Sequence, residues 1–333
     1  MILVTGATGH IGNILVRKLV AQGNRVRALI WRGEDTTPLQ DVDVETVQGD
    51  VLEAESLGTA MRGVTTVFHL AGLISIMPGV DALLQQVNVQ GTRNVLAAAE
   101  EEGVQRLVYT SSIHALQDRP RGEQIDETVP FDPQNAPGAY GRSKAAASMA
   151  VQEAARQGLN AVIVCPTGVM GPYDFRRSEI GSVLLDAALG KTMAFVDGAY
   201  DFADVRDVAD GILLAAEKGR SGETYILSGR KISVRYILET VREVTGRAFG
   251  CIKVPFGLAK LAAVVMPYYY RRTRGKPRFT ALSLDVLRSN SNISHAKASA
   301  ELGYQPRNLF DSIADAVAWF LENRSVLKVP RTP

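Results

Sequence analysis

Glycines near the start of the chain form a pattern that could bind a phosphate group. The segment Thr5-Gly6-Ala7-Thr8-Gly9-His10-Ile11-Gly12 lies between the apolar run 2–4 and a helical apolar pattern over 11–22. Glycines at such a turn let the backbone approach a pyrophosphate, and the helix N-terminus adds free amide donors and the positive end of its dipole. Glycines also build ordinary turns, but the strand–turn–helix context favours dinucleotide binding by Gly6, Thr8, Gly9, His10, Ile11 and Gly12.

A second pattern combines a tyrosine with a lysine four residues later, Tyr140 and Lys144, and Ser112 precedes them in the chain. On a helix, this spacing places both side chains on one face. Together with the Gly-x-x-Gly-x-x-Gly spacing, the Tyr-x-x-x-Lys motif resembles that of the extended branch of the short-chain dehydrogenase/reductase superfamily.

The resemblance extends over nearly the whole chain. It is nearest to the dihydroflavonol reductase and hydroxysteroid dehydrogenase members, and to the hopanoid-associated sugar epimerases. The further matching stretches are Gly49-Asp50-Val51, His69-Leu70-Ala71-Gly72, Asn88-Val89-Gln90-Gly91-Thr92, Tyr109-Thr110-Ser111-Ser112, Pro166 through Gly171-Pro172, and Asp204-Val205-Arg206-Asp207-Val208-Ala209.

The resemblance implies a catalytic role for each of three residues. Tyr140 would be the general acid/base that protonates a carbonyl oxygen as hydride arrives, or deprotonates an alcohol in reverse. Lys144 would lower the pKa of Tyr140 from about 10 and hold the nicotinamide ribose. Ser112 would hydrogen-bond the reacting oxygen. The alternative for Tyr140 is a tyrosine at a helix N-terminus that only packs.

Further residues would line the cofactor by the same resemblance. Asp50 and Val51 would flank the adenine, although Asp50 could also be a turn residue. Asn88 matches a family position at a helix start, where its other interpretation is an N-cap. The remaining implied contacts are Leu70, Ala71, Gly72, Thr110 and Pro166.

The end of the second strand, 25–30, should decide between NAD and NADP. An acid there binds the ribose 2′-hydroxyl of NAD, whereas an arginine accommodates the 2′-phosphate of NADP. Ile30 occupies the position where the related sugar epimerases carry their acid. Trp31 could stack on the adenine and Arg32 could bind the phosphate, which favours NADP. Glu34 and Asp35 are close enough in the chain to keep NAD as the alternative.

Residues that could contact a substrate are less clearly marked. His114 follows Ser112 by two positions and could face the pocket, although a lone histidine is more often packed or solvated. Ile74, Phe175 and Phe195 could be apolar pocket walls, and core packing explains them nearly as well.

These residues predict an NADP-dependent oxidoreductase that interconverts a ketone or aldehyde with an alcohol. The alternative is a nucleotide-sugar epimerase or dehydratase with tightly held NAD, which needs cations for a sugar diphosphate. The candidates for that role are Arg176, Arg177, Arg235 and Arg271. A dinucleotide-sensing scaffold on the same fold is a third reading, which the retained tyrosine, lysine and serine make less attractive.

The elements that must position these residues alternate between strand and helix from the start of the chain. Such alternation predicts an α/β fold of Rossmann type, a doubly wound parallel sheet covered by helices on both faces. We expect the dinucleotide-binding domain at 1–166, with 201–228 returning to it. A smaller, mostly C-terminal α+β substrate lobe should comprise 167–200 and 229–330.

Composition excludes several other classes of protein. The 333 residues carry 37 Lys and Arg against 35 Asp and Glu, too balanced for nucleic acid as the main partner. Cys165 and Cys251 have no metal-ligand spacing and form no disulfide framework, so we expect no metal. The early strand leaves no room for a signal peptide, and no long uncharged apolar stretch could span a membrane. We therefore expect a cytoplasmic protein.

Two features suggest larger partners. The segment 256–276 is apolar, contains Tyr268-Tyr269-Tyr270 and ends in basic residues, so peripheral membrane contact is one interpretation and a substrate-covering helix is the other. Two Ala-rich helical patterns, 91–102 and 140–156, have counterparts in the resembling branch that often pair across a two-fold axis. We expect a homodimer on that basis.

Overall fold

The main element of the fold is a parallel sheet. The computed structural model describes the whole chain except residues 76–78, 263–283, 285–286 and 326–333. Seven strands pair in the order β10-β6-β5-β4-β1-β2-β3, all parallel. They are β1 (Ile2–Thr5), β2 (Val26–Ile30), β3 (Glu45–Gln48), β4 (Thr66–His69), β5 (Arg106–Thr110), β6 (Ala161–Pro166) and β10 (Thr224–Leu227). The predicted Rossmann-type class is confirmed.

Burial along the strands follows their place in the sheet. Every residue of the inner strand β6 is buried, as expected for a parallel strand covered on both faces. The edge strand β3 is largely exposed and carries polar residues, which protects an otherwise open edge from pairing with other chains.

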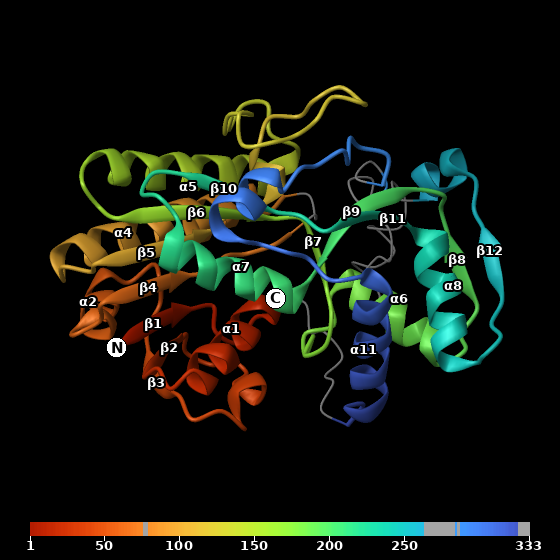
Figure 1. Cartoon of the computed structure of the whole chain (residues 1–333), viewed down its shortest axis with the longest axis horizontal. Helices are drawn as coiled ribbons and strands as arrows, with labels where there is room; N and C mark the ends of the chain where they lie inside the picture. The colour runs from red at the N-terminus through yellow and green to blue at the C-terminus, as the bar shows by residue number, and fades with distance from the viewer. Residues whose placement is uncertain (76–78, 263–283, 285–286, 326–333) are drawn as a thin grey trace.

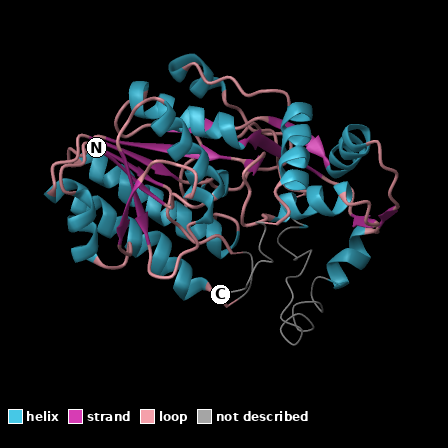
Figure 2. Ribbon diagram, turned by 90° about the horizontal axis from the view of Figure 1, so that it is seen from below, coloured by secondary structure: helices cyan, strands magenta, loops and turns pink. Residues whose placement is uncertain are grey.

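Helices cover both faces of the sheet (Figures 1 and 2). On one face, α1 (His10–Ala21) packs against α7 (Val205–Lys218), and Leu15 and Ile212 belong to the core beneath them. On the other face lie α2 (Ala54–Met61), α4 (Gly91–Glu101) and α5 (Gly138–Arg156), with Val95 and Val151 in their core. Shorter helical segments are η1 (Thr37–Leu39), α3 (Asp81–Leu84), η2 (Gln85–Gln90), η3 (Ile113–Ala115) and η4 (Ala298–Leu302).

A second lobe lies beyond the carboxyl ends of these strands, at the right of Figure 1. It contains a three-stranded sheet, ordered β11-β9-β7, and the pair β12-β8. Its own core includes Leu184, Ile237, Val317 and Phe320. The elements are β7 (Gly168–Met170), α6 (Glu179–Ala188), β8 (Met193–Phe195), β9 (Ala199–Asp204), β11 (Arg230–Ser233), α8 (Val234–Thr245), β12 (Cys251–Lys253) and α11 (Leu309–Glu322).

One buried carboxylate joins the two lobes where the chain returns from the small sheet to the large one. Asp204 ends β9 and is the N-cap of α7, where its side chain accepts the backbone N–H of Arg206 at 2.7 Å. The Arg206 guanidinium binds both carboxylate oxygens of Asp204 and also Asp315 on α11, each at 2.7–2.9 Å. Asp204 therefore holds β9, α7 and α11 together.

The segment predicted to contact membranes, 256–276, is described only over 256–262. These residues are helical, and the side chains of Leu258 and Leu261 are exposed. Residues 263–276 lie outside the described residues. In the part of the chain that the structure describes, no helix is both long enough and apolar enough to cross a bilayer.

We predict that Asp204→Ala lowers the free energy of unfolding by about 3–5 kcal/mol, because it leaves the Arg206 guanidinium and the first turn of α7 without their buried partner. Asp315→Ala is the control. It removes a half-exposed partner of the same arginine and should cost less than about 1 kcal/mol. Urea unfolding of both variants tests this, and equal losses would contradict it.

Candidate active site

The predicted cofactor residues gather where the parallel strands end. Most of them follow or close a strand, so that they share one edge of the sheet, where α/β proteins bind ligands. Asn88 and Lys144 lie instead in the helical segments η2 and α5. The glycine turn follows β1, Trp31 and Arg32 follow β2, Asp50 and Val51 follow β3, Leu70, Ala71 and Gly72 follow β4, and Thr110 and Pro166 are the last residues of β5 and β6.

The glycine turn is shaped as a phosphate cradle. Gly6 has φ +70°, and a Cβ there would lie 2.7 Å from the backbone N of Ala71. At Gly12, a Cβ would lie 2.1 Å from the carbonyl oxygen of Gly6. Helix α1 begins at His10, and its N-cap, Gly9, supplies no side-chain cap. The first amides of α1 are therefore free of a capping side chain, as anion binding requires.

Strands β1 and β4 are tied together by a buried chain of hydrogen bonds that sequence reasoning did not anticipate. The Ala71 N–H donates to the Thr5 hydroxyl, which donates to Nδ1 of His69 at 2.7 Å. Nε2 of His69 then bonds the Thr92 hydroxyl at 3.0 Å, which donates to the carbonyl of Asn88. Burial lowers the pKa of His69 to about 3, so the ring is neutral and links the turn to the next helix.

Asn88 is not the N-cap that one interpretation expected. It lies inside the π-helical turn η2, where the backbone widens before α4, and α4 has no side-chain cap. Its amide accepts from Leu73 N at 2.7 Å and donates to Leu73 O and to Ser143 Oγ. The wider turn brings Asn88 inward, against α5 and the segment after β4, instead of along the axis of α4.

Ser112, Tyr140 and Lys144 are brought together at the end of β5 and the start of α5. The Ser112 hydroxyl lies close enough to Tyr140 to lower the pKa of the tyrosine, against the effect of burial. Lys144 is buried, and its Nζ donates to Thr110 O at 2.6 Å and to the Tyr109 hydroxyl at 3.0 Å. A helix start at Gly138 explains the arrangement, because Tyr140 and Lys144 then lie one turn apart on the same face.

Burial controls both titrating groups in this state. It raises the pKa of Tyr140 to about 12, against the opposing effect of Ser112. It lowers the pKa of Lys144 to about 7. The expected lowering of the Tyr140 pKa by Lys144 is not seen in this state, because the effect of burial on Tyr140 outweighs the lowering influences.

The residues present fit a dinucleotide. Besides the glycine cradle, the Thr110 hydroxyl is buried beside Lys144 without a hydrogen-bond partner, and a ligand hydroxyl could satisfy it. Gly72 keeps the space next to Asn88 and Lys144 open, since a Cβ there would lie 3.2 Å from Asn88 Oδ1 and 3.7 Å from Lys144 Nζ.

Other predicted cofactor residues have local roles as well. Asp50 accepts the N–H of Leu52 at 2.9 Å, which is the turn that its alternative interpretation described. Val51 packs so closely on Gly91 that a Cβ there would lie 2.7 Å from Val51 Cγ2. His10 donates from Nε2 to the carbonyl of Pro172 in the other lobe at 2.9 Å.

At the end of β2, the predicted phosphate-binding pair is exposed. Trp31 has 54% of its surface accessible, and Arg32 is also exposed. Glu34 is the residue that turns inward, where its carboxylate contacts the Thr8 hydroxyl of the glycine turn.

His114 is the predicted substrate residue that the structure keeps close to the catalytic groups. Its N–H donates to Ser112 Oγ at 3.2 Å, and its Nε2 bonds the hydroxyl of Tyr200 on β9 at 3.1 Å. Burial lowers the pKa of His114 to about 4 and raises that of Tyr200, so both side chains are neutral near pH 7.

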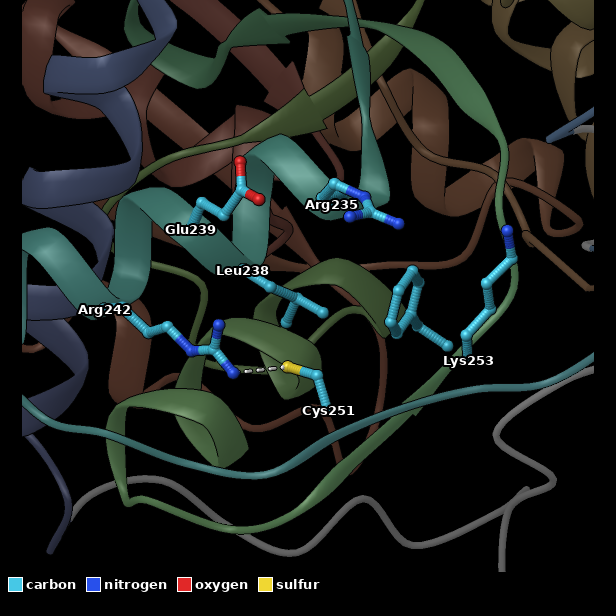
Figure 3. A pocket seen from close by; sticks show the side chains of 7 residues that line it. Arg235, Leu238, Glu239, Arg242, Cys251 and Lys253 are labelled. Carbon is cyan, nitrogen blue, oxygen red and sulfur yellow. Dashed lines mark hydrogen bonds between the residues drawn. The ribbon is translucent and has the colours of Figure 1, made fainter.

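The other predicted pocket residues lie elsewhere. Ile74 is 74% exposed, and Phe175 packs edge-on against Trp319 at 5.0 Å in the core of the second lobe. Phe195 lines a cavity of about 190 Å³ between α8 and β12. Figure 3 shows that Arg235 and Arg242 of α8 and Lys253 of β12 surround this cavity, with Arg242 bonded to Cys251.

Comparison with known proteins agrees with this geometry. The model of the NAD dependent epimerase/dehydratase family matches residues 2–228. The chain belongs to this family. It is therefore an extended short-chain dehydrogenase/reductase, an NAD(P)-dependent enzyme, as the motifs predicted.

Several family members resemble it over almost their full length. Sterol demethylase protein B of Methylococcus capsulatus is 40% identical over 324 residues, which cover 96% of this chain and 98% of the relative. The 4-hydroxy-2-methyl-3-oxo-4-farnesyl-3,4-dihydroquinoline-1-oxide ketoreductase of Stigmatella aurantiaca is 33% identical, covering 94% of each. The protein in the crystal structure of gox2253 is 34% identical in sequence, and the two structures superpose with a TM-score of 0.84. The match covers 98% of this chain and 99% of that chain.

Sequence reasoning missed two residues that hold predicted site residues in place. Tyr109 holds Lys144, and Ser143 holds Asn88. Ser143 directly precedes Lys144, and this position is a signal that could have been used. Tyr109 lies in a buried strand and belongs to a matching stretch, but its bond to Lys144 joins residues 35 positions apart and leaves no local signal in the sequence.

We predict that Lys144→Met raises the free energy of unfolding at pH 7 by about 1–4 kcal/mol. The native pKa of about 7 lies below the ordinary value of 10.5, so the fold disfavours the charged lysine. The loss of folding free energy caused by burying this amine is complete below pH 7. It disappears as pH rises to about 10.5, where the lysine is neutral in both the folded and the unfolded state.

Urea unfolding at pH 7 and pH 10 measures this, and the gain should shrink at the higher pH. Lys231→Met, at an exposed position, is the control and should show no comparable gain. A gain that is the same at both pH values would contradict the burial argument.

Proposed function

We propose that this enzyme interconverts a ketone or aldehyde with an alcohol, using NADP or NAD as the hydride carrier. The observation that carries the proposal is the gathering of Ser112, Tyr140 and the buried Lys144 at the sheet edge that holds the glycine cradle. A proton donor, an oxygen-binding hydroxyl and a dinucleotide cradle are what carbonyl reduction requires.

Each residue then has a defined task. Tyr140 holds the proton that the substrate oxygen takes up, and the Ser112 hydroxyl orients that oxygen. Lys144 lies beside Gly72, where a negatively charged ligand would favour its ammonium form and so favour the phenolate as well. The dinucleotide supplies or accepts the hydride. Asn88 positions the segment after β4 through Leu73.

The neutral pair His114 and Tyr200 supports an uncharged substrate. Both side chains lie near Tyr140, and both are neutral near pH 7, so they offer hydrogen bonds to a carbonyl or hydroxyl and no charge to a diphosphate. The relatives named for a sterol and for a farnesyl quinoline ketone are consistent with a lipophilic alcohol or ketone.

The alternative, a nucleotide-sugar epimerase or dehydratase, needs cations that meet at one diphosphate. Arg176 is bonded to Glu34 and Thr8, whereas Arg235 faces Asp197 and Phe195 in the cavity of Figure 3. Arg271 lies outside the described residues. These two arginines have separate partners, which favours the simple oxidoreductase.

We predict that Tyr140→Phe lowers turnover at least about 10²-fold, the usual contribution of a positioned general acid. Dinucleotide binding should stay nearly intact, because the glycine cradle is unchanged. The assay is reduction of whichever ketone in a carbonyl panel the wild-type protein accepts, with cofactor fluorescence as the binding control. Undiminished turnover would remove Tyr140 from the mechanism.

We also propose a homodimer through α4 and α5. Met149 on α5 is 45% exposed, as a side chain at such an interface would be in a single chain. Light scattering after size exclusion should give about twice the chain mass of 36.0 kDa, and Met149→Arg should shift it towards the monomer. A wild-type protein of one chain mass would disprove the dimer.

A further inference from the structure

Glu34 is a buried carboxylate at the entrance of the cofactor cradle. Its side chain is only 7% exposed although it stands in the turn after β2, among the exposed Trp31 and Arg32. Oε2 accepts the backbone N–H of Trp31 at 3.1 Å, and Oε1 accepts the hydroxyl of Thr8. The carboxylate is thereby held against the glycine turn.

A residue of the other lobe also binds this carboxylate. Arg176 lies between β7 and α6, and its Nη2 donates to Glu34 Oε1 at 2.9 Å and to Thr8 Oγ1 at 2.7 Å. The same segment is fixed to α1 by two further bonds, from His10 to Pro172 O and from Asn13 to Tyr173 O. Both lobes therefore hold Glu34 at the junction of the glycine turn and β2.

This junction is where NAD and NADP differ chemically. A carboxylate at the end of the second strand can accept hydrogen bonds from a ribose 2′-hydroxyl, whereas it repels a 2′-phosphate. Three donors fix the Glu34 carboxylate, so it cannot easily turn away from an incoming phosphate. The exposed Arg32 has no comparable anchoring in the contacts described above.

We propose that Glu34 is the residue that selects the cofactor, and that it selects NAD over NADP. The proposal rests on the proposed dinucleotide chemistry of this site. Glu34, and not Arg32, would then decide which cofactor binds. Glu34 stands four positions beyond Ile30, the position where the related sugar epimerases carry their acid.

Arg176 has a distinct part in this arrangement. Its guanidinium offsets part of the Glu34 charge and would lie beside a 2′-phosphate placed against that carboxylate. Removing Arg176 should therefore weaken the binding of NADPH more than that of NADH. Removing the charge of Glu34 should strengthen the binding of NADPH relative to that of NADH. The two substitutions act in opposite directions although both break the same ion pair, so general loosening of the turn cannot imitate the result.

The experiment is fluorescence titration of the full-length protein, freed of any co-purified nucleotide, with NADH and NADPH. The wild type should bind NADH at least about tenfold more tightly. Glu34→Gln should lower the ratio of the NADPH to the NADH dissociation constant at least about tenfold, and Glu34→Asp, which keeps the charge, should largely preserve it. Arg176→Met should raise the ratio, and Arg32→Ala, the matched control, should leave it unchanged.

Several outcomes would overturn the proposal. The first is tighter binding of NADPH than of NADH by the wild type. The second is a selective loss of NADPH binding in Arg32→Ala. The third is an unchanged ratio of the two dissociation constants in a Glu34→Gln variant whose melting temperature equals that of the wild type. Tight binding of both dinucleotides with no effect of Glu34 would leave the oxidoreductase assignment standing and remove only the selection by Glu34. Failure to bind either dinucleotide would contradict the proposed function itself.

Discussion

The buried amine of Lys144 constrains the whole catalytic edge of the sheet. Its Nζ is held by the carbonyl of Thr110 and the hydroxyl of Tyr109, two neutral oxygens, and burial lowers its pKa to about 7. Burial also raises the pKa of Tyr140 to about 12, so that the tyrosine keeps its proton. A ligand that brings negative charge close to Nζ would restore the ammonium and lower the pKa of Tyr140 with it.

The backbone around this amine is positioned by neutral groups. His69 bridges Thr5 and Thr92, and Thr92 in turn satisfies the carbonyl of Asn88 in the π-helical turn. Because every donor and acceptor along this chain is matched, the buried polar groups cost little and orient one another. The same turn presents the Asn88 amide to the segment after β4, so the widened helix and the cradle are parts of one arrangement.

The two lobes meet through charge on opposite sides of the site. Asp204, fully buried, joins β9 and α7 to α11 through Arg206, while Glu34 receives Arg176 across the cofactor cradle. Buried carboxylates of this kind contribute little net stability compared with apolar packing, and they specify one relative placement of their partners. In this protein, the Asp204 contacts fix α7 and α11 relative to β9, and the Glu34 contacts fix the segment between β7 and α6 against the glycine turn.

The sequence by itself determined the fold class and predicted the Tyr140–Lys144 pair. Strand–helix alternation is a local periodicity, and the Tyr140–Lys144 spacing needs only one helical turn, so both could be inferred without tertiary contacts. Tertiary structure decided the rest. Glu34 and Arg176 are 142 positions apart, and His114 and Tyr200 are 86 positions apart, so no local pattern announces either pair. Phe195 and Phe175 looked like pocket walls because apolar residues of a core and of a pocket have the same composition. The inward position of Asn88 depends on one extra residue in a helical turn, which is set by packing of η2 against α5 and leaves no periodic trace in the sequence.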